Sequence, residues 1–209
     1  MTRQEALMDQ PAAAPRIAEE DALRADLYDF LAALLARPPG ADLLRKTAAL
    51  HGDESDLGQA IAALARVAAV TRARAAESEF NALFIGLGRG ELLPYASYYL
   101  TGFLNEKPLA ALRRDMAARG MTRAETVYEP EDNIASTMEM MAGLVRGRFG
   151  APAPLDDQKL FFGKHVGPWA GHFFADLEGA RNSVLYASVG AVGRIFMEIE
   201  AQGFRMSAG

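Results

Sequence analysis

The sequence predicts an all-α protein, and three observations support that prediction. Apolar residues recur at helical spacing along most of the 209 residues, no segment alternates apolar and polar residues as a strand does, and Pro or Gly clusters end the periodic stretches. Half of the residues are hydrophobic, which is enough for a substantial core. We therefore expect a single bundle-like helical fold with an N-terminal part, residues 20–127, and a smaller C-terminal part, residues 128–209, after a flexible leader, residues 1–19.

The N-terminal part begins with a helix from about Asp21, which Arg37-Pro38-Pro39-Gly40 ends. A second periodic stretch covers residues 57–79 and is rich in Ala, the residue of highest helix propensity. Residues 81–90 break the spacing through three glycines, so we expect a long structured loop there rather than a strand. The apolar stripe of the first helix comprises Leu23, Leu27, Phe30, Leu31 and Leu34.

The remaining helices are expected over residues 106–119, from Pro130 to about Gly150, and over residues 181–202, with one or two more between the last two stretches. Gly120 ends the first of these. The residue before a proline avoids helical geometry, so Pro130 should lie at or near the first turn of its helix.

The segment from Glu129 to Met141 leads clustered carboxylates into an amphipathic helix. Asp132 and Glu139 lie roughly 10 Å apart along a helix, too far to act as a paired acid and base, so a docking edge is predicted rather than a catalytic centre. The core face is expected to hold Ile134, Met138, Met141, Ala142 and Val145, and the face open to a partner Asp132, Ser136, Glu139, Gly143 and Arg146.

The composition argues against several classes of function. The 22 basic and 27 acidic residues give a net charge of -5, which argues against nucleic-acid binding and favours a basic partner. The chain has no cysteine, which excludes disulfides, thiolate nucleophiles and Cys-type zinc sites. His165 and His172 are too far apart on a helix to share an ion, so no metal site is expected. No apolar run approaches the ~18 residues of a membrane span, so we expect a cytoplasmic protein without stable membrane insertion.

Two loop motifs have competing interpretations. Gly86, Gly88 and Gly90 resemble a phosphate cradle, but they follow a helix and lack the Gly-Lys-Ser/Thr ending, so a connector is favoured by about five to one. The cluster Tyr95, Ser97, Tyr98 and Tyr99 suits a surface that holds an apolar peptide and hydrogen-bonds its backbone. Core burial is the alternative for each tyrosine, yet at least one should face a groove.

Three signatures, taken in order, resemble the TorD/DmsD family of molybdoenzyme maturation chaperones, which is sometimes grouped with NarJ as redox enzyme maturation proteins. The first is Glu77-x-x-Phe80-Asn81-x-Leu83-Phe84-Ile85-Gly86-x-Gly88-x-Gly90, continued by Leu93-Pro94-Tyr95-x-Ser97-Tyr98-Tyr99-Leu100. The second is Glu129-Pro130-x-Asp132-Asn133-Ile134, followed by Met138-Glu139-Met140-Met141, and the third joins Phe161 or Phe162 to His165, Pro168-Trp169 and Phe173.

The resemblance implies a non-enzymatic chaperone that binds the twin-arginine signal peptide of a molybdoenzyme precursor until its cofactor is inserted, before Tat export. It implies no tightly bound cofactor, but a transient contact with molybdopterin guanine dinucleotide or a guanine nucleotide. The family usually has His where this chain has Asn133, so a role that depends on imidazole charge does not transfer. The implied peptide-binding residues are Tyr95, Ser97, Tyr98, Glu129, Pro130, Glu131, Asp132 and Asn133.

Three other functions remain open. A NarJ-type chaperone for a nitrate reductase belongs to the same class, although the Pro94-Tyr95 and Glu129-Pro130 motifs favour the TorD/DmsD branch. A nucleotide-binding switch would use the glycine loop, and a helical scaffold would have no peptide client. The protein is expected to be a monomer or a domain-swapped dimer. The identity of the client does not follow from the sequence.

Overall fold

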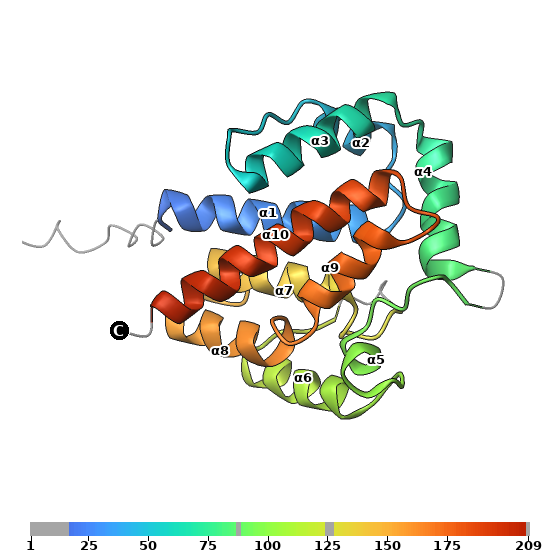
Figure 1. Ribbon diagram of the computed structural model, residues 1–209. Helices are drawn as coiled ribbons and strands as arrows, with labels where there is room; N and C mark the ends of the chain where they lie inside the picture. The colour runs from blue at the N-terminus through green and yellow to red at the C-terminus, as the bar shows by residue number, and fades with distance from the viewer. Residues whose placement is uncertain (1–16, 87–88, 124–127, 208–209) are drawn as a thin grey trace, which may run out of the picture.

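The computed structural model describes residues 17–86, 89–123 and 128–207 (Figure 1). These residues contain no β-strand, only one isolated bridge between Tyr95 and Asn133, so the all-α prediction is confirmed. The helices are α1 (Glu19–Ala36), α2 (Ala41–Ala48), α3 (Asp56–Val70), α4 (Ala73–Phe80), the π-helical turn η1 (Asn81–Ile85), α5 (Ala96–Thr101), α6 (Lys107–Ala118), α7 (Ile134–Arg146), α8 (Leu155–His165), α9 (Ala170–Gly179) and α10 (Leu185–Met206).

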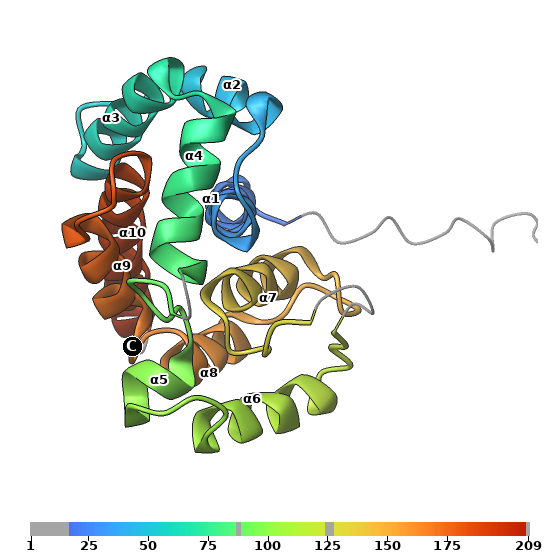
Figure 2. The ribbon, with the colours of Figure 1, turned by 90° about the vertical axis from the view of Figure 1, so that its right-hand side faces the viewer.

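The helices of the two predicted parts pack against one another. Helix α1 lies along α7, α10 packs on both α9 and α3, and α2 covers α3. Figure 2 views α1 nearly end-on, with α7 below it and α2 and α3 above it. One cluster of buried side chains includes residues from α1 through α10. The predicted boundary between residues 127 and 128 adjoins residues 124–127, and most of the predicted leader, residues 1–16, also lies outside the described residues.

Helix α1 begins with three carboxylates in its first turn, where the helix dipole favours negative charge, and ends just before Pro38 as expected. Leu31 and Leu34 of its predicted stripe are fully buried. Leu23, at the other end of the same stripe, is 64% exposed. The stripe continues past the point where neighbouring helices cover it, because α10 diverges from α1 toward this end of the molecule (Figure 1).

The single stretch predicted over residues 57–79 is two helices. The Ser55 hydroxyl caps α3 by accepting a hydrogen bond from the Gly58 N–H at 3.0 Å, and extended backbone at Thr71 ends it. Helix α4 then runs directly into η1, so the loop expected over residues 81–90 is wrong for its first five residues. Both helices are Ala-rich, and periodicity alone does not reveal the change of direction between them.

The glycines after η1 allow the chain to fold back on this turn. Gly86 has a φ of 61°, in the left-handed region that favours glycine. A Cβ on Gly90 would lie 2.5 Å from the Leu83 carbonyl oxygen, which is closer than any side chain tolerates. The Leu92 N–H donates to that same oxygen at 2.8 Å. Close backbone packing therefore accounts for both glycines, in agreement with the connector interpretation; Gly88 lies outside the described residues.

Helix α7 begins at Ile134, four residues after Pro130, so the prediction that Pro130 lies in its first turn is wrong. The Asn133 side-chain oxygen caps the helix by accepting from the Ala135 N–H at 2.9 Å. The helix ends at Arg146, because Gly147 turns the chain with a φ of 76°, earlier than the predicted end at Gly150. The five residues predicted on its core face are all buried.

The last helices tie the two parts together. Glu79 on α4 caps α10, since its carboxylate accepts from the backbone N–H groups of Val184 at 2.7 Å and Tyr186 at 2.8 Å. Helix α10 therefore begins and ends four residues later than the predicted range of 181–202. Glu200, only 4% exposed, accepts hydrogen bonds from Arg24 at 2.8 Å and from the Tyr28 hydroxyl at 2.9 Å. These bonds hold α10 against α1.

Candidate functional site

Two loops that are about 35 residues apart in the sequence meet at the start of α7. The Ala96 N–H donates to the Asp132 carbonyl oxygen, and the Ile134 N–H donates to the Pro94 carbonyl oxygen, both at 2.9 Å. The Asp132 carboxylate accepts two hydrogen bonds from Ser97, one from the backbone N–H at 2.8 Å and one from the hydroxyl at 2.5 Å. Together these bonds join the Tyr95 loop to the loop that precedes α7.

Asp132 and Ser97 are buried, with exposed fractions of 1% and 0%. The prediction that Asp132 lies on a face open to a partner is therefore wrong, and so is the same prediction for Gly143, which packs against Phe149. Asp132 faces inward because it belongs to the turn before α7 and not to the helix itself. Its position suits a residue that fixes two loops rather than one that contacts a ligand.

Tyr95 and Glu129 form a second pair between the two loops, and this pair lies nearer the surface than Asp132 and Ser97. The Tyr95 hydroxyl donates a hydrogen bond to the Glu129 carboxylate. Partial burial and the nearby carboxylate raise the pKa of Tyr95 well above its ordinary value, so the hydroxyl stays a donor at neutral pH. Glu129 itself is exposed. The pair places one carboxylate at the mouth of a surface hollow.

That hollow has a volume of about 190 Å³ and lies on one side of the exposed face of α7. Phe80 and Phe84 form part of its apolar wall, and Tyr95, Glu129 and Asn133 line its rim. Tyr95 thus meets the expectation that at least one tyrosine faces a groove. Partner-binding roles for the eight predicted residues remain predictions.

A second hollow of about 320 Å³ lies on the other side of α7 and has Met116 of α6 in its lining. Figure 2 shows α6 below α7. Its wall contains Met116, Met140 and Phe149, with Asp29, Glu131, Arg123 and Arg148 among them. Ser136 and Glu139 line both hollows. The exposed face of α7 therefore separates two lobes of one cleft, which we call the α7 cleft.

Glu139 has the least compensated charge in the α7 cleft. Burial raises its pKa above the ordinary value, and the negative charge of Asp29 raises it further, while Arg148 opposes the shift. The Arg148 guanidinium is already bound to Asp29, with N···O distances of 2.8 and 2.5 Å. Among the described residues, no Lys, Arg or His forms an ion pair with Glu139. A cation that binds in the cleft would offset the negative charge of Glu139.

The other predicted carboxylate, Glu131, is occupied by cations of the chain itself. Arg113 contacts its carboxylate at 2.8 Å, and the Glu131 side chain is 12% exposed. Burial is the largest single influence and favours the neutral acid, but the hydrogen bonds and the positive charges of Arg113 and Arg123 together outweigh it and lower the pKa of Glu131. Pro130 is half-buried and its carbonyl oxygen accepts from the Asn133 N–H at 3.1 Å. Glu131 and Pro130 thus shape the loop more than they offer free groups.

Tyr98, Tyr99 and His165 have partners within the chain. The Arg89 guanidinium donates to the Tyr98 hydroxyl at 2.7 Å and lies over its ring, whereas the Tyr99 hydroxyl donates to Asp176 at 2.9 Å. His165 is buried, as expected of a core histidine, with its Nε2 2.6 Å from Asp115. In the described ranges no group of three or more His, Asp or Glu is arranged to bind a metal ion, and no helix has the length and apolarity to cross a membrane.

Comparison with known proteins identifies the family of this chain. The family model described as the nitrate reductase delta subunit matches residues 51–175, which include both loops and all of α7. The chain belongs to this family. The resemblance drawn from the three signatures is thereby confirmed. The family match includes Tyr95, Glu129 and Glu139, whereas Asp29 on α1 lies before its first residue.

Relatives within the family carry the name chaperone protein TorD. One from Vibrio cholerae El Tor Inaba is 30% identical over 99 residues, covering 44% of this chain and 45% of the relative. One from Aliivibrio fischeri is 26% identical over 137 residues, covering 58% and 64%. The chain thus spans less than two thirds of these relatives. A putative redox enzyme maturation protein from Archaeoglobus fulgidus, 20% identical, has the same fold, with a TM-score of 0.52 over 93% of this chain and 99% of that one.

Proposed function

We propose that the protein is a cytoplasmic chaperone without catalytic activity, which binds the twin-arginine signal peptide of a molybdoenzyme precursor. It would hold the precursor while the molybdopterin cofactor is inserted and release it for Tat export. Family membership and the TorD name of the relatives support the class of function. The α7 cleft supports the signal peptide as the ligand.

The uncompensated carboxylates of the α7 cleft carry the proposal. Glu139 lies between the two lobes with a raised pKa and no ion pair among the described residues, and Glu129 is exposed at the rim. A twin-arginine signal peptide combines guanidinium groups with an apolar segment, and the cleft combines carboxylates with aromatic and Met side chains. A charged hydrogen bond in a partly desolvated site contributes about 1.5–3 kcal/mol, whereas an exposed ion pair contributes far less.

The same lining is less suited to a phosphate-bearing ligand. Asp29, Glu131 and Glu139 outnumber the two arginines of the larger lobe, and one of those arginines is bound to Asp29. A transient contact with molybdopterin guanine dinucleotide or a guanine nucleotide stays a prediction. A nitrate reductase client is the second candidate, favoured by the description of the family model.

Calorimetric titration of a synthetic twin-arginine signal peptide tests the proposal. We expect Glu139→Gln to weaken binding by about tenfold, the equivalent of one charged hydrogen bond. Glu106→Gln is a matched control, because Glu106 is exposed and precedes α6, away from the cleft lining. The proposal is wrong if the wild-type protein does not bind the peptide, or if Glu139→Gln and Glu129→Gln both retain full affinity. Tighter binding of a nitrate reductase N-terminal peptide would favour the second candidate.

A further inference from the structure

A separate groove lies on the opposite side of α1 from the α7 cleft. It has a volume of about 570 Å³ and is lined by residues of α1, α3, α10 and the connection between α2 and α3. Figure 1 shows the arrangement of these helices. Asp29 and Ala33 of α1 face the α7 cleft, whereas Leu27 and Phe30 of the same helix face this groove. We call it the α1–α3–α10 groove. One short peptide cannot occupy both sites at once, because α1 separates them.

The α1–α3–α10 groove gathers exposed aliphatic side chains from three segments. Leu23 on α1 is 64% exposed, Ile199 on α10 is 46% exposed and Leu50 before α3 is 36% exposed. Leu57 and Ile61 of α3 complete its apolar wall. Single exposed apolar residues are common on soluble proteins, but several around one hollow mark an interaction surface. The groove therefore suits an apolar helix with side chains on one face.

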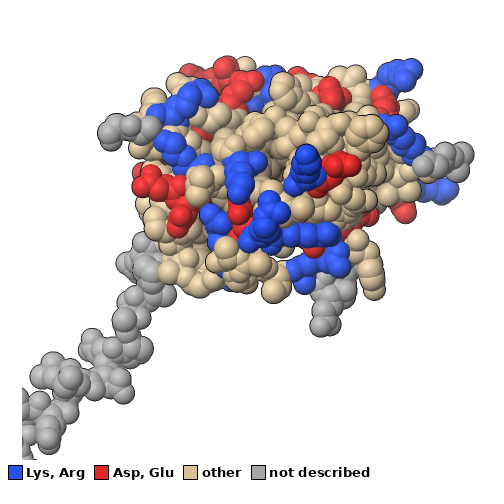
Figure 3. Space-filling view, turned by 90° about the horizontal axis from the view of Figure 1, so that it is seen from below, with Lys and Arg blue, Asp and Glu red and all other residues tan. Residues whose placement is uncertain are grey.

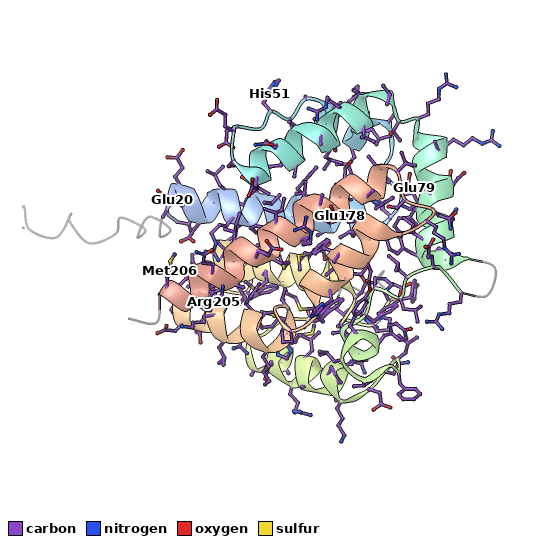
Figure 4. The ribbon with its side chains drawn as sticks, in the orientation of Figure 1. Glu20, His51, Glu79, Glu178, Arg205 and Met206 are labelled. Atoms are coloured by element: carbon purple, nitrogen blue, oxygen red, sulfur yellow. The ribbon has the colours of Figure 1, made fainter. Side chains whose placement is uncertain are left out.

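Carboxylates surround one end of this groove. Glu20 lines it, and Glu19 and Asp21 belong to the same first turn of α1. The connection between α2 and α3, which carries the lining residues Leu50 and His51, also contains Asp53 and Glu54, and α3 begins with Asp56. Figure 4 labels Glu20 and His51, which both lie toward this end of the molecule.

The groove has little positive charge of its own to offset these carboxylates. Arg24, which lines the groove, is already held by Glu200 at 2.8 Å and by Asp21 at 2.6 Å. Lys and Arg side chains also gather on the lower face of the molecule, which Figure 3 shows, whereas α3 lies at the top of Figure 1. The charge around the groove therefore complements a cationic segment and repels an anionic lipid surface.

We propose that the α1–α3–α10 groove docks an apolar helix of a partner protein, whose flanking Lys or Arg residues lie over the carboxylates around Glu20 and Glu54. Apolar burial against Leu23, Leu50 and Ile199 supplies the affinity, and the carboxylates set the direction in which the helix lies. The site is independent of the α7 cleft, so a partner helix and a signal peptide bind at the same time.

The absence of cysteine from the chain allows a site-specific test. A Leu23→Cys variant carries an environment-sensitive fluorophore in the groove, and a Val70→Cys variant carries it at an 82% exposed position outside the groove lining. The probe is a synthetic Leu/Ala helix of about 15 residues with lysines at one end, long enough to span about 20 Å. We expect peptide addition to blue-shift the fluorophore at position 23 and not at position 70.

Charge and groove variants decide the outcome. The same peptide with glutamates in place of lysines should bind at least about tenfold more weakly, and Leu23→Glu should weaken the lysine peptide by a similar factor. Val70→Glu and Glu139→Gln should each leave its affinity within about twofold, which separates this proposal from the α7 cleft. Circular dichroism verifies that each variant is folded. Equal binding of the two peptides, or no loss of affinity in Leu23→Glu, would overturn the proposal.

Sedimentation velocity of the unlabelled protein tests the alternative occupant. If the wild-type chain forms a dimer that Leu23→Glu dissociates, a second copy covers the groove and the partner-helix proposal is wrong. A monomer at the concentrations of the titration supports it.

Discussion

Replacing Asp132 with alanine should destabilise the whole fold rather than only weaken ligand binding. The Asp132 carboxylate is 1% exposed and accepts two hydrogen bonds from Ser97, at 2.8 and 2.5 Å. A hydrogen bond to a charged group contributes about 1.5–3 kcal/mol, so removing two gives about 3–6 kcal/mol before relaxation. The second carboxylate oxygen lacks a partner within the described structure, and losing its buried charge offsets part of that cost. We therefore expect a loss of about 3 kcal/mol.

Thermal unfolding followed by circular dichroism measures this effect. For a protein of this size about 1 kcal/mol corresponds to 2–4 °C, so the midpoint of Asp132→Ala should fall by roughly 6–12 °C. Ser97→Ala removes only the hydroxyl bond and should have a smaller effect. The double variant should cost less than the sum of the two single changes, because both disrupt the same contact. A midpoint of Asp132→Ala within about 2 °C of wild type, or strictly additive effects, would refute the reasoning.

Two further predictions concern the interior. Glu200→Ala should cost about 3 kcal/mol in urea unfolding, because it removes the buried partner of Tyr28 and leaves the partly buried Arg24 with Asp21 alone. Glu198→Ala, at a 65% exposed side chain, should cost less than about 0.5 kcal/mol, and similar losses in both would contradict the prediction. Burial lowers the pKa of His165 below its ordinary value, despite the opposing bond to Asp115, so the unfolded state takes up the proton first and stability should fall as pH drops below about 6.5. His165→Gln should show a smaller loss between pH 7 and about pH 5, and an unchanged loss would refute that origin.

Helix periodicity predicted the fold well where one helix face meets a continuous core. The five residues predicted on the core face of α7 are all buried, because α1 and α8 cover that face along its length. Leu23 belongs to the predicted apolar stripe of α1 but is exposed, since α1 extends past its neighbours and the same pattern there lines an open groove. A hydrophobic pattern specifies which side of a helix is apolar, but only the tertiary arrangement decides where that side is covered.

The element boundaries depended on contacts that are distant in the sequence. Glu79 caps α10 across more than 100 residues, which fixes the start of α10 at Leu185. The π-helical turn after α4 is stabilised by a chain reversal through Gly86 and Gly90, whose roles depend on close backbone approach. Neither effect has a local signal in periodicity or propensity. The sequence therefore indicated that residues 81–90 are irregular, but it did not indicate the π-helical turn or the chain reversal.

The predicted peptide-binding residues come from two separate motifs of the sequence, and the structure brings Tyr95, Glu129 and Asn133 of these motifs together. Sequence reasoning could not separate the carboxylates by environment, because the burial of Asp132 depends on Ser97 and the pairing of Glu131 depends on Arg113. The position of Glu139 was indicated by helical periodicity, which placed it on the open face of α7. The family signature, however, pointed to the residues before the helix as the binding residues.

The carboxylates before and within α7 therefore fall into two groups with different roles. Asp132 and Glu131 are bound by groups of the chain itself, so their charge contributes to holding the loops and is not available to a ligand. Glu129 and Glu139 remain accessible, one at the rim and one between the lobes. Asn133 caps α7 through its side-chain oxygen, which fixes the start of the helix without a group that titrates near neutral pH. Acidification should weaken ligand binding in this cleft through Glu139, because burial and the negative charge of Asp29 raise the pKa of its carboxyl group.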